Sequence, residues 1–256
     1  MEGDGASFAT GFLGPHAELL GLLRRARRCP GLLRLRLGGS ALQGFSIPEP
    51  AASVRLLVPR PGESFALPTW NGNEFLHDDG NRPALRTFTP VAVGPDGLVV
   101  DVVRHPGGAV SGWAESASPG DPCAVSGPGR GETIDPEAGR YLLFGDETAI
   151  PAIEQLLEAI PGPTPVDAHI EIVDHTARIP LPERADGRIE WHVAARDDPP
   201  GSAMRAAVNA AEIGEDTRLW VAGEAAAVQA IRRHLSDVRG VPRSRTTVRG
   251  YWKVRR

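Results

Sequence analysis

The sequence predicts two domains, an antiparallel β-barrel or sandwich followed by an α/β domain with a parallel sheet. Residues 84–126 contain short strand-like runs with turn signals between them, which is typical of an antiparallel β domain. Beyond residue 138, strand-like runs alternate with helical periodicity, which predicts a parallel sheet. The length of 256 residues suits two domains of ordinary size. We therefore expect domains at residues 1–137 and 138–256.

The composition is that of a soluble globular protein with many turns. Hydrophobic residues make up 41% and charged residues 23%, and the chain has 30 glycines and 24 prolines. The net charge of -4 gives no attraction for nucleic acid or an anionic membrane. Cys29 and Cys123 are too few for a disulfide framework and lack metal-ligand spacing, so we expect idle or buried thiols. Without a signal-peptide pattern or an apolar run long enough for a bilayer, a cytoplasmic location is expected.

The amino-terminal part carries the weakest signals. Leu19 to Arg28 is apolar and then basic, which fits a short helix or a bent strand. Leu32 to Leu37 alternates as a half-buried strand does, and Ser53 to Val58 predicts another strand. Residues 63–82 are expected to form a polar loop, in which His77-Asp78-Asp79-Gly80 is interpreted as turn chemistry and not as a metal site.

The middle of the chain predicts a hairpin and a helix. Arg86 to Val93 reads as one strand, and a turn at Pro95-Asp96-Gly97 joins it to a partner strand at Leu98 to Arg104. A helix is expected to open at Gly108, and a strand at Pro122 to Ser126 follows the turn at 119–121.

The second half predicts four strands that alternate with three helices. The strands are expected at Tyr141 to Phe144, Val166 to Val173, Ile189 to Val193 and Leu219 to Ala222, and the helices at Ala149 to Ile160, Ser202 to Ile213 and Ala225 to Leu235.

One stretch, from residue 86 to 113, combines three features that a flavin with a diphosphate tail requires. Arg86 offers a guanidinium that binds phosphate bidentately, and Phe88 offers an aromatic face. The turn before Gly108-Ala109-Val110-Ser111 opens a helix whose first N–H groups are unpaired, and such a terminus favours a diphosphate. Each feature also fits an ordinary role in the fold, so the combination carries the prediction.

Another set of candidates lies at strand ends in the second half. Gly145 to Thr148 follows the first predicted strand of the α/β domain, at the sheet edge where ligands bind. Asp146 and Glu147 also suit the start of a helix as acids, which leaves a purely structural role open. This stretch is not a G-x-G-x-x-G fingerprint, and neither is 127–131.

The sequence resembles the siderophore-interacting protein family, flavin-dependent ferric-siderophore reductases within the ferredoxin-reductase-like superfamily. Eight segments match in the family's order and together cover residues 84–252. They are Arg86-Thr87-Phe88-Thr89-Pro90, Asp101-Val102-Val103-Arg104-His105, 108–114, Pro119-Gly120-Asp121, Gly127-Pro128, 144–152, 220–224 and Tyr251-Trp252. Phe88 departs from the family, which more often has tyrosine at this position. The loss of a hydroxyl removes a hydrogen bond worth about 1 kcal/mol.

The resemblance implies a two-domain ferredoxin-reductase-like fold, with an FAD-binding Greek-key barrel and an NAD(P)H-binding α/β domain. It implies reduction of ferric-siderophore iron with NADPH or NADH as the electron donor, and FAD carries the chemistry, so no catalytic side chain and no protein-bound metal is expected. The residues expected to bind FAD or the nicotinamide nucleotide are Arg86, Thr87, Phe88, Thr89, Asp101, Val103, His105, Gly108, Ala109, Val110, Ser111, Gly145, Asp146, Glu147, Thr148, Ala222, Gly223, Glu224, Tyr251 and Trp252.

The expected substrate is an anionic ferric siderophore, which a basic surface would attract. Candidates for this surface are Arg55, Arg130, Arg249 and Lys253, and the adenine ribose of the donor is placed near Asp174 to Arg178. A monomer is expected. Two alternatives stay open: a flavin reductase or electron carrier with another acceptor, and a redox-inactive module that binds siderophore or flavin.

Overall fold

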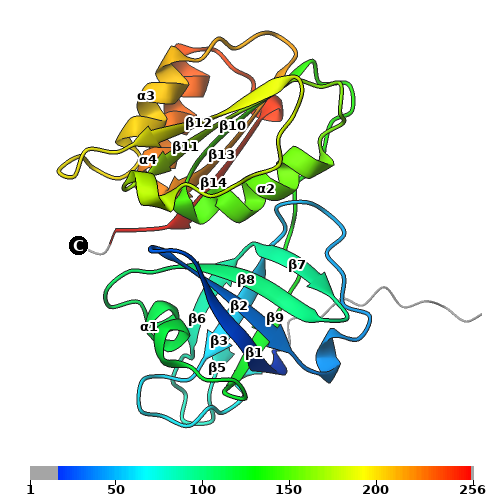
Figure 1. Cartoon of the computed structure of the whole chain (residues 1–256), viewed down its shortest axis with the longest axis vertical. Helices are drawn as coiled ribbons and strands as arrows, with labels where there is room; N and C mark the ends of the chain where they lie inside the picture. Colours follow the sequence, from blue (N-terminus) through cyan, green and yellow to red (C-terminus); the bar gives the residue numbers. More distant parts are fainter. Residues whose placement is uncertain (1–16, 255–256) are drawn as a thin grey trace, which may run out of the picture.

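The computed structural model describes residues 17–254, which form a β-barrel half and an α/β half, one above the other in Figure 1. The barrel half is one antiparallel sheet of seven strands in the order β6-β3-β9-β1-β2-β8-β7. These strands are β1 (Glu18–Cys29), β2 (Leu32–Gly38), β3 (Val54–Val58), β6 (Ala84–Phe88), β7 (Pro90–Gly94), β8 (Gly97–Val103) and β9 (Pro122–Ser126).

The order of the strands explains why this sheet closes into a barrel. Strands β6 and β7 lie at opposite ends of the sheet, yet only Thr89 separates them in the sequence. The two edges must therefore come together, and the sheet curls around its apolar face. The expected single strand from Arg86 to Val93 is wrong for this reason, because Pro90 has no N–H to continue a ladder and the chain changes direction there.

Several smaller elements complete this half. Helix α1 (Ala109–Ser116) lies against β3, β6 and β8, and Trp113 anchors it in the barrel core. Residues 63–82 are not all loop, because β4 (Thr69–Trp70) and β5 (Phe75–Leu76) form a two-stranded sheet. A 3₁₀ turn, η1 (Ser40–Leu42), follows β2. Of the two structures considered for Leu19 to Arg28, the strand is the observed one.

The α/β half is a five-stranded parallel sheet in the order β12-β11-β10-β13-β14. Its strands are β10 (Arg140–Asp146), β11 (Val166–Ile172), β12 (Gly187–Val193), β13 (Thr217–Glu224) and β14 (Thr246–Trp252), and its helices are α2 (Ile150–Ala159), α3 (Ser202–Ala210) and α4 (Ala225–Arg233). Short helical turns η2 (Glu147–Ala149), η3 (His175–Ala177), η4 (His234–Val238) and η5 (Arg243–Arg245) connect them. Strand β14, which contains Tyr251 and Trp252, was not predicted from the sequence.

The two faces of this sheet have separate cores. On one face α2 packs Ile153 and Leu156 against Leu143 and Ile170. On the other face α3 and α4 cover Phe144 and neighbouring apolar residues. The strand order reverses between β10 and β13, and the carboxyl ends at such a reversal are where open α/β sheets bind ligands. That end faces the barrel, because η2 follows β10 and lies against β8.

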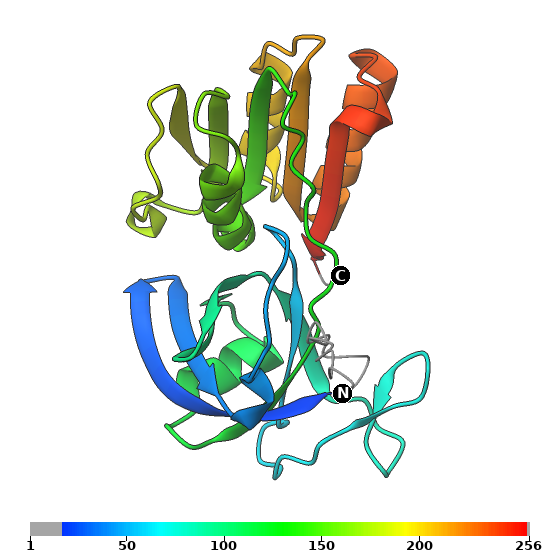
Figure 2. The ribbon, with the colours of Figure 1, turned by 90° about the vertical axis from the view of Figure 1, so that its right-hand side faces the viewer.

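The halves are joined by the segment between β9 and β10 and by polar contacts. Figure 2 shows this segment running alongside β14 to the far end of β10. The Thr247 hydroxyl donates to the Glu132 carboxylate over 2.8 Å. On α2, Gln155 accepts from the Ala51 N–H at 2.7 Å and donates to the Pro90 carbonyl at 2.6 Å. Within the described residues, no helix is long and apolar enough to cross a membrane.

Candidate flavin and nicotinamide site

The first group of expected cofactor residues lies on β6 and the start of α1. Ala84, Arg86 and Phe88 are two residues apart on β6, so their side chains lie on the same face of the strand. Ala84 and Phe88 pack on this face against the barrel core that contains Trp113 of α1. Its guanidinium is exposed and donates to the neighbouring Leu85 carbonyl at 2.6 Å. Gly108 is the N-cap of α1, and no side chain caps the first-turn N–H groups. The cation and the aromatic ring thus lie on β6, which α1 contacts.

The turn before α1 explains the glycine at its N-cap. A Cβ atom at Gly108 would lie 2.3 Å from Cε1 of the His105 imidazole, so a larger residue here would force this exposed ring to move. The backbone N–H of His105 donates to Ser111 Oγ at 3.1 Å, which joins the end of β8 to the helix. This N–H is therefore already paired inside the protein, although His105 is among the residues expected to bind the cofactor.

Two expected residues have side chains that point elsewhere. Thr87 alternates with Arg86 and is exposed on the opposite face of β6, opposite Arg55 in the ladder. Val103 packs against the core of the α/β half. Neither side chain joins the group around Arg86, so any contact of these two residues with a cofactor would be through the backbone.

Asp101 has a different role from the one expected. Its carboxylate is buried and accepts from Arg28 at 2.8 Å and from both Nε and an Nη of Arg34 at 2.8 Å. Arg28 also bonds Glu154 of α2 at 3.2 Å. Asp101 raises the pKa of Arg34 by hydrogen bonding, which opposes the effect of burial. The carboxylate is thus committed to an ion-pair network that ties the barrel to α2, and its side chain is not free for a cofactor.

The second group of expected residues meets at the carboxyl edge of the parallel sheet. Gly145 on β10 lies beside Ala222 on β13, and Gly223 lies beside Gly250 on β14. A Cβ at Gly145 would lie 2.5 Å from Ala149 Cβ, and one at Gly223 would lie 2.6 Å from an oxygen of Asp146. Both glycines are therefore required by close packing at this edge.

Asp146 is the centre of this edge. One carboxylate oxygen accepts from the Thr148 N–H at 2.9 Å and from the Thr148 hydroxyl at 2.5 Å. The other accepts from the Glu224 N–H at 3.0 Å and from Trp252 Nε1 at 2.7 Å. Burial raises the pKa of Asp146, and these donors oppose the rise. Asp146 thus holds three strand ends together, and its carboxylate has no oxygen left for a ligand.

The two glutamates expected here also make internal contacts. Glu147 accepts from the Val173 N–H at 2.8 Å, and burial raises its pKa. Glu224 caps α4 by accepting from Ala226 at 2.7 Å and Ala227 at 2.9 Å. The helix-start role that the sequence left open for Asp146 and Glu147 is thus observed for Asp146, which accepts from Thr148, whereas Glu147 bonds the segment after β11.

Tyr251 and Trp252 connect this edge to the barrel. Burial raises the pKa of the Tyr251 phenol, and the nearby Thr89 side chain opposes this rise. The ring also packs edge-on against Trp220, with centroids 6.2 Å apart. Thr89, Tyr251 and the strand ends around Asp146 therefore form a continuous set of contacts between the halves.

The residues present fit a flavin with a diphosphate tail. The uncapped α1 terminus, the exposed Arg86 guanidinium and the partly buried Phe88 are the groups that such a cofactor needs. Residues 174–176 and Arg178, in the stretch predicted to lie near the adenine ribose of a nicotinamide donor, are exposed after β11.

The expected substrate residues are only partly brought together. Arg130 and Arg249 line one cavity of about 860 Å³. Arg232 and Arg243 line the same cavity and were not among the predicted substrate residues. Arg249 also donates to the carbonyls of Ala51 and Arg130. Arg55 lies over the Trp70 ring, 5.6 Å from its centroid, and Lys253 is exposed near the carboxyl terminus. Neither residue lines this cavity.

The architecture defines the class of protein: an antiparallel barrel followed by a doubly wound parallel sheet is ferredoxin-reductase-like. A Plasmodium falciparum ferredoxin-NADP⁺ reductase structure shares this fold, with a TM-score of 0.63 at 10% identity over 92% of this chain and 96% of that one. At this identity the likeness concerns the fold alone.

The family follows from two sequence models, which match most of the chain. The siderophore-interacting FAD-binding domain matches residues 22–132, and the siderophore-interacting protein model matches residues 138–255. The chain belongs to the siderophore-interacting protein family, and it contains the family's FAD-binding domain.

Relatives with names agree with this assignment. The chain is 31% identical over 241 residues to an NADPH-dependent ferric-chelate reductase of Escherichia coli, covering 92% of each. It is 27% identical over 251 residues to the ferric vibriobactin reductase ViuB of Vibrio cholerae, covering 93% of this chain and 90% of ViuB. A siderophore utilization protein from T. fusca superposes with a TM-score of 0.82 at 32% identity, covering 93% and 92%.

Proposed function

We propose that this protein is a flavin-dependent reductase that uses NADPH or NADH to reduce iron held by a siderophore, releasing ferrous iron in the cytoplasm. The observation that supports this most is that the carboxyl edge of the parallel sheet contacts the barrel, so that the two halves that carry the expected sites adjoin. The group around Arg86 and α1 belongs to the barrel, the nicotinamide group belongs to the sheet edge, and Tyr251 contacts Thr89 between them. The names of the two bacterial reductases point to the same chemistry.

The protein's part in this chemistry is to bind and orient. Arg86 and the first amides of α1 would hold the diphosphate of FAD, and Phe88 would contact the ring. The edge formed by 145–148 and 222–224 would receive the nicotinamide nucleotide. When bound, the flavin accepts two electrons as a hydride and passes them singly to ferric iron. No acid, base or nucleophile from the chain is required for this transfer.

The siderophore would be received by basic residues. Four arginines and two glutamates line the cavity that contains Arg130 and Arg249, so its wall carries a net positive charge that suits an anionic chelate. Arg55 and Lys253 stay candidates for a wider basic surface. Reduction would release the metal, because ferrous iron binds hard oxygen donors less tightly than ferric iron does.

An anaerobic titration tests the proposal. The purified protein should show a flavin spectrum that NADPH or NADH bleaches and that a ferric siderophore restores, while a ferrous-specific dye reports the released iron. A yellow protein that neither donor bleaches would contradict the reductase function. Bleaching followed by oxidation with a quinone or free flavin, but not with ferric siderophores, would support the alternative acceptor.

A further inference from the structure

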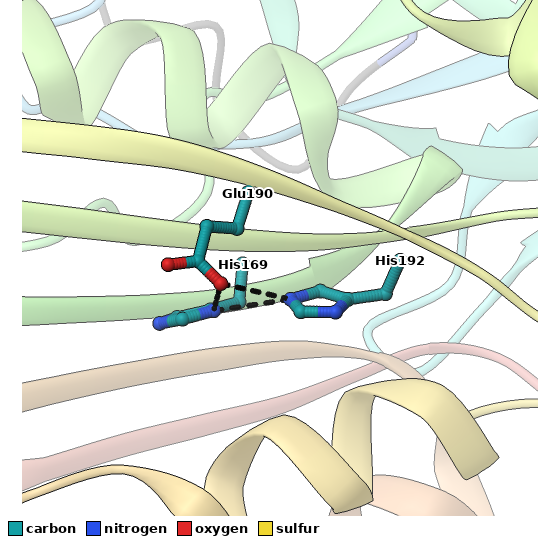
Figure 3. A group of neighbouring side chains, drawn as sticks. All are labelled: His169, Glu190 and His192. Carbon is teal, nitrogen blue, oxygen red and sulfur yellow. Dashed lines mark hydrogen bonds and ion pairs between the residues drawn. The ribbon is translucent and has the colours of Figure 1, made fainter.

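Three side chains of types that can bind a metal ion lie together on β11 and β12 of the α/β half. None of them belongs to the predicted flavin or nicotinamide residues. His169 lies on β11, and Glu190 and His192 lie on the adjacent edge strand β12. His169 is paired with Glu190 in the parallel ladder, and His192 follows two residues later on the same face. Figure 3 shows the three side chains with their polar atoms turned toward one another.

The separations between these atoms fit a single ion. His169 Nδ1 lies 3.1 Å from His192 Nε2 and 3.6 Å from Glu190 Oε2, and the latter two atoms lie 4.0 Å apart. Zinc binds histidine nitrogen and carboxylate oxygen at about 2.0–2.2 Å, so neighbouring ligands of a tetrahedral ion are about 3.4 Å apart. The three observed distances lie on either side of this value.

The surroundings hold the ligands in place and leave an entrance. The His169 ring is stacked between Phe144 and His192, with centroids 5.0 Å and 5.3 Å away, and its side chain is 13% exposed. Glu190, by contrast, is 41% exposed on the edge strand, so an ion can enter from solvent. Arg188 Nε lies 3.5 Å from the other Glu190 oxygen, Oε1, which leaves Oε2 directed at the histidines.

We propose that His169, Glu190 and His192 form a site for one divalent first-row transition-metal ion, with zinc or ferrous iron as the fitting ions. Two imidazoles and one carboxylate are the donor set of open zinc sites and of ferrous sites with free positions. The site is distinct from the expected flavin and nicotinamide residues, and its argument does not rest on the proposed reductase function. A bound ion would cross-link β12, an edge strand, to β11.

Metal titration of the full-length, flavin-loaded protein tests the site. After stripping with a chelator, Zn²⁺ is titrated against a chromophoric competitor, and one ion per chain is expected. Glu190→Gln and, separately, His192→Asn should each weaken zinc binding by at least about tenfold. Glu190→Gln changes a partly exposed side chain on an edge strand and keeps its size, so it stays informative if the histidine variant folds poorly. His77→Asn, in the loop with Asp78 and Asp79, is the matched control and should bind zinc as the unchanged protein does.

Two results would overturn the proposal. One is equal zinc affinity in the unchanged protein and in Glu190→Gln, which would leave only a histidine–histidine hydrogen bond at this place. The other is an anomalous-scattering peak at the zinc edge, from zinc-soaked crystals, that lies away from these three side chains. Supporting results are a peak between them and a zinc-dependent rise in melting temperature that Glu190→Gln abolishes.

Discussion

Arg86 is the residue whose assigned role is most open to a direct test. Its exposed guanidinium donates to the carbonyl of its own neighbour, so it is available for a phosphate. We expect Arg86→Ala to weaken FAD binding by about tenfold or more, because a charge-assisted pair is lost. FAD affinity is measured by flavin fluorescence on reconstitution of the flavin-free protein. Arg36→Ala, which removes another strand arginine on β2, should leave it unchanged. Equal FAD affinity in Arg86→Ala and the unchanged protein would contradict the role.

The buried Cys123 thiol leads to a prediction about how the unfolding free energy depends on pH. Burial in the barrel raises the pKa of its thiol from 9.0 to about 12. The folded protein therefore holds this proton more tightly than the unfolded chain, and the stability that results is present below pH 9 and lost as pH rises from 9 toward 12. The unfolding free energy of the unchanged protein should fall by about 2 kcal/mol more than that of Cys123→Ala between about pH 8 and 10.5.

Urea denaturation at both pH values measures this difference. Val125→Ala removes a buried neighbour on β9 that does not titrate, so its stability gap to the unchanged protein should be the same at both pH values. A gap between Cys123→Ala and the unchanged protein that also stays constant would show that the thiol is not held in its neutral form.

At the scale of elements, the turn from β13 to α4 is built around a glycine. Gly223 has a φ of 156°, and an added Cβ would lie 2.6 Å from Asp146 Oδ2, which also accepts from Trp252. We expect Gly223→Ala to lower the unfolding free energy by about 1–3 kcal/mol and to weaken binding of the nicotinamide donor. Thermal unfolding and donor titration measure the two effects. Gly162→Ala adds a methyl group in open space and should be nearly neutral.

Local sequence signals predicted most elements because each carries its own pattern. The strand at Pro122 to Ser126 and the helix that opens at Gly108 were predicted correctly from turn residues and periodicity. Strand β14 was missed because apolar and polar residues alternate only weakly along it and because it contains a glycine. It forms a strand by pairing with β13. The break at Thr89 was missed because barrel closure, and not local propensity, sets it.

At the scale of the whole molecule, Gln155 is one of the contacts that join the two halves. Its side chain bonds the Ala51 N–H and the Pro90 carbonyl, both in the barrel. We expect Gln155→Ala to leave FAD affinity unchanged and to slow flavin reduction by NADPH about threefold to tenfold, because small misplacements slow transfer steps. Stopped-flow absorbance measures this rate. Gln229→Ala, on the exposed side of α4, should leave the rate unchanged, and an equal rate in both variants would contradict an aligning role for Gln155.

Local residue patterns by themselves predicted the two-part architecture and the resemblance to the family, while the flavin group at Arg86, Phe88 and Gly108 stays a prediction. They did so because strand and helix periodicity, turn glycines and a helix start are properties of neighbouring residues. Only the tertiary structure decided that Asp101 joins Arg28, Arg34 and Glu154, that Asp146 ties three strand ends, and that His169, Glu190 and His192 converge. These contacts join residues that are far apart in the chain. Barrel closure and strand pairing bring these residues together, and no local sequence pattern predicts either.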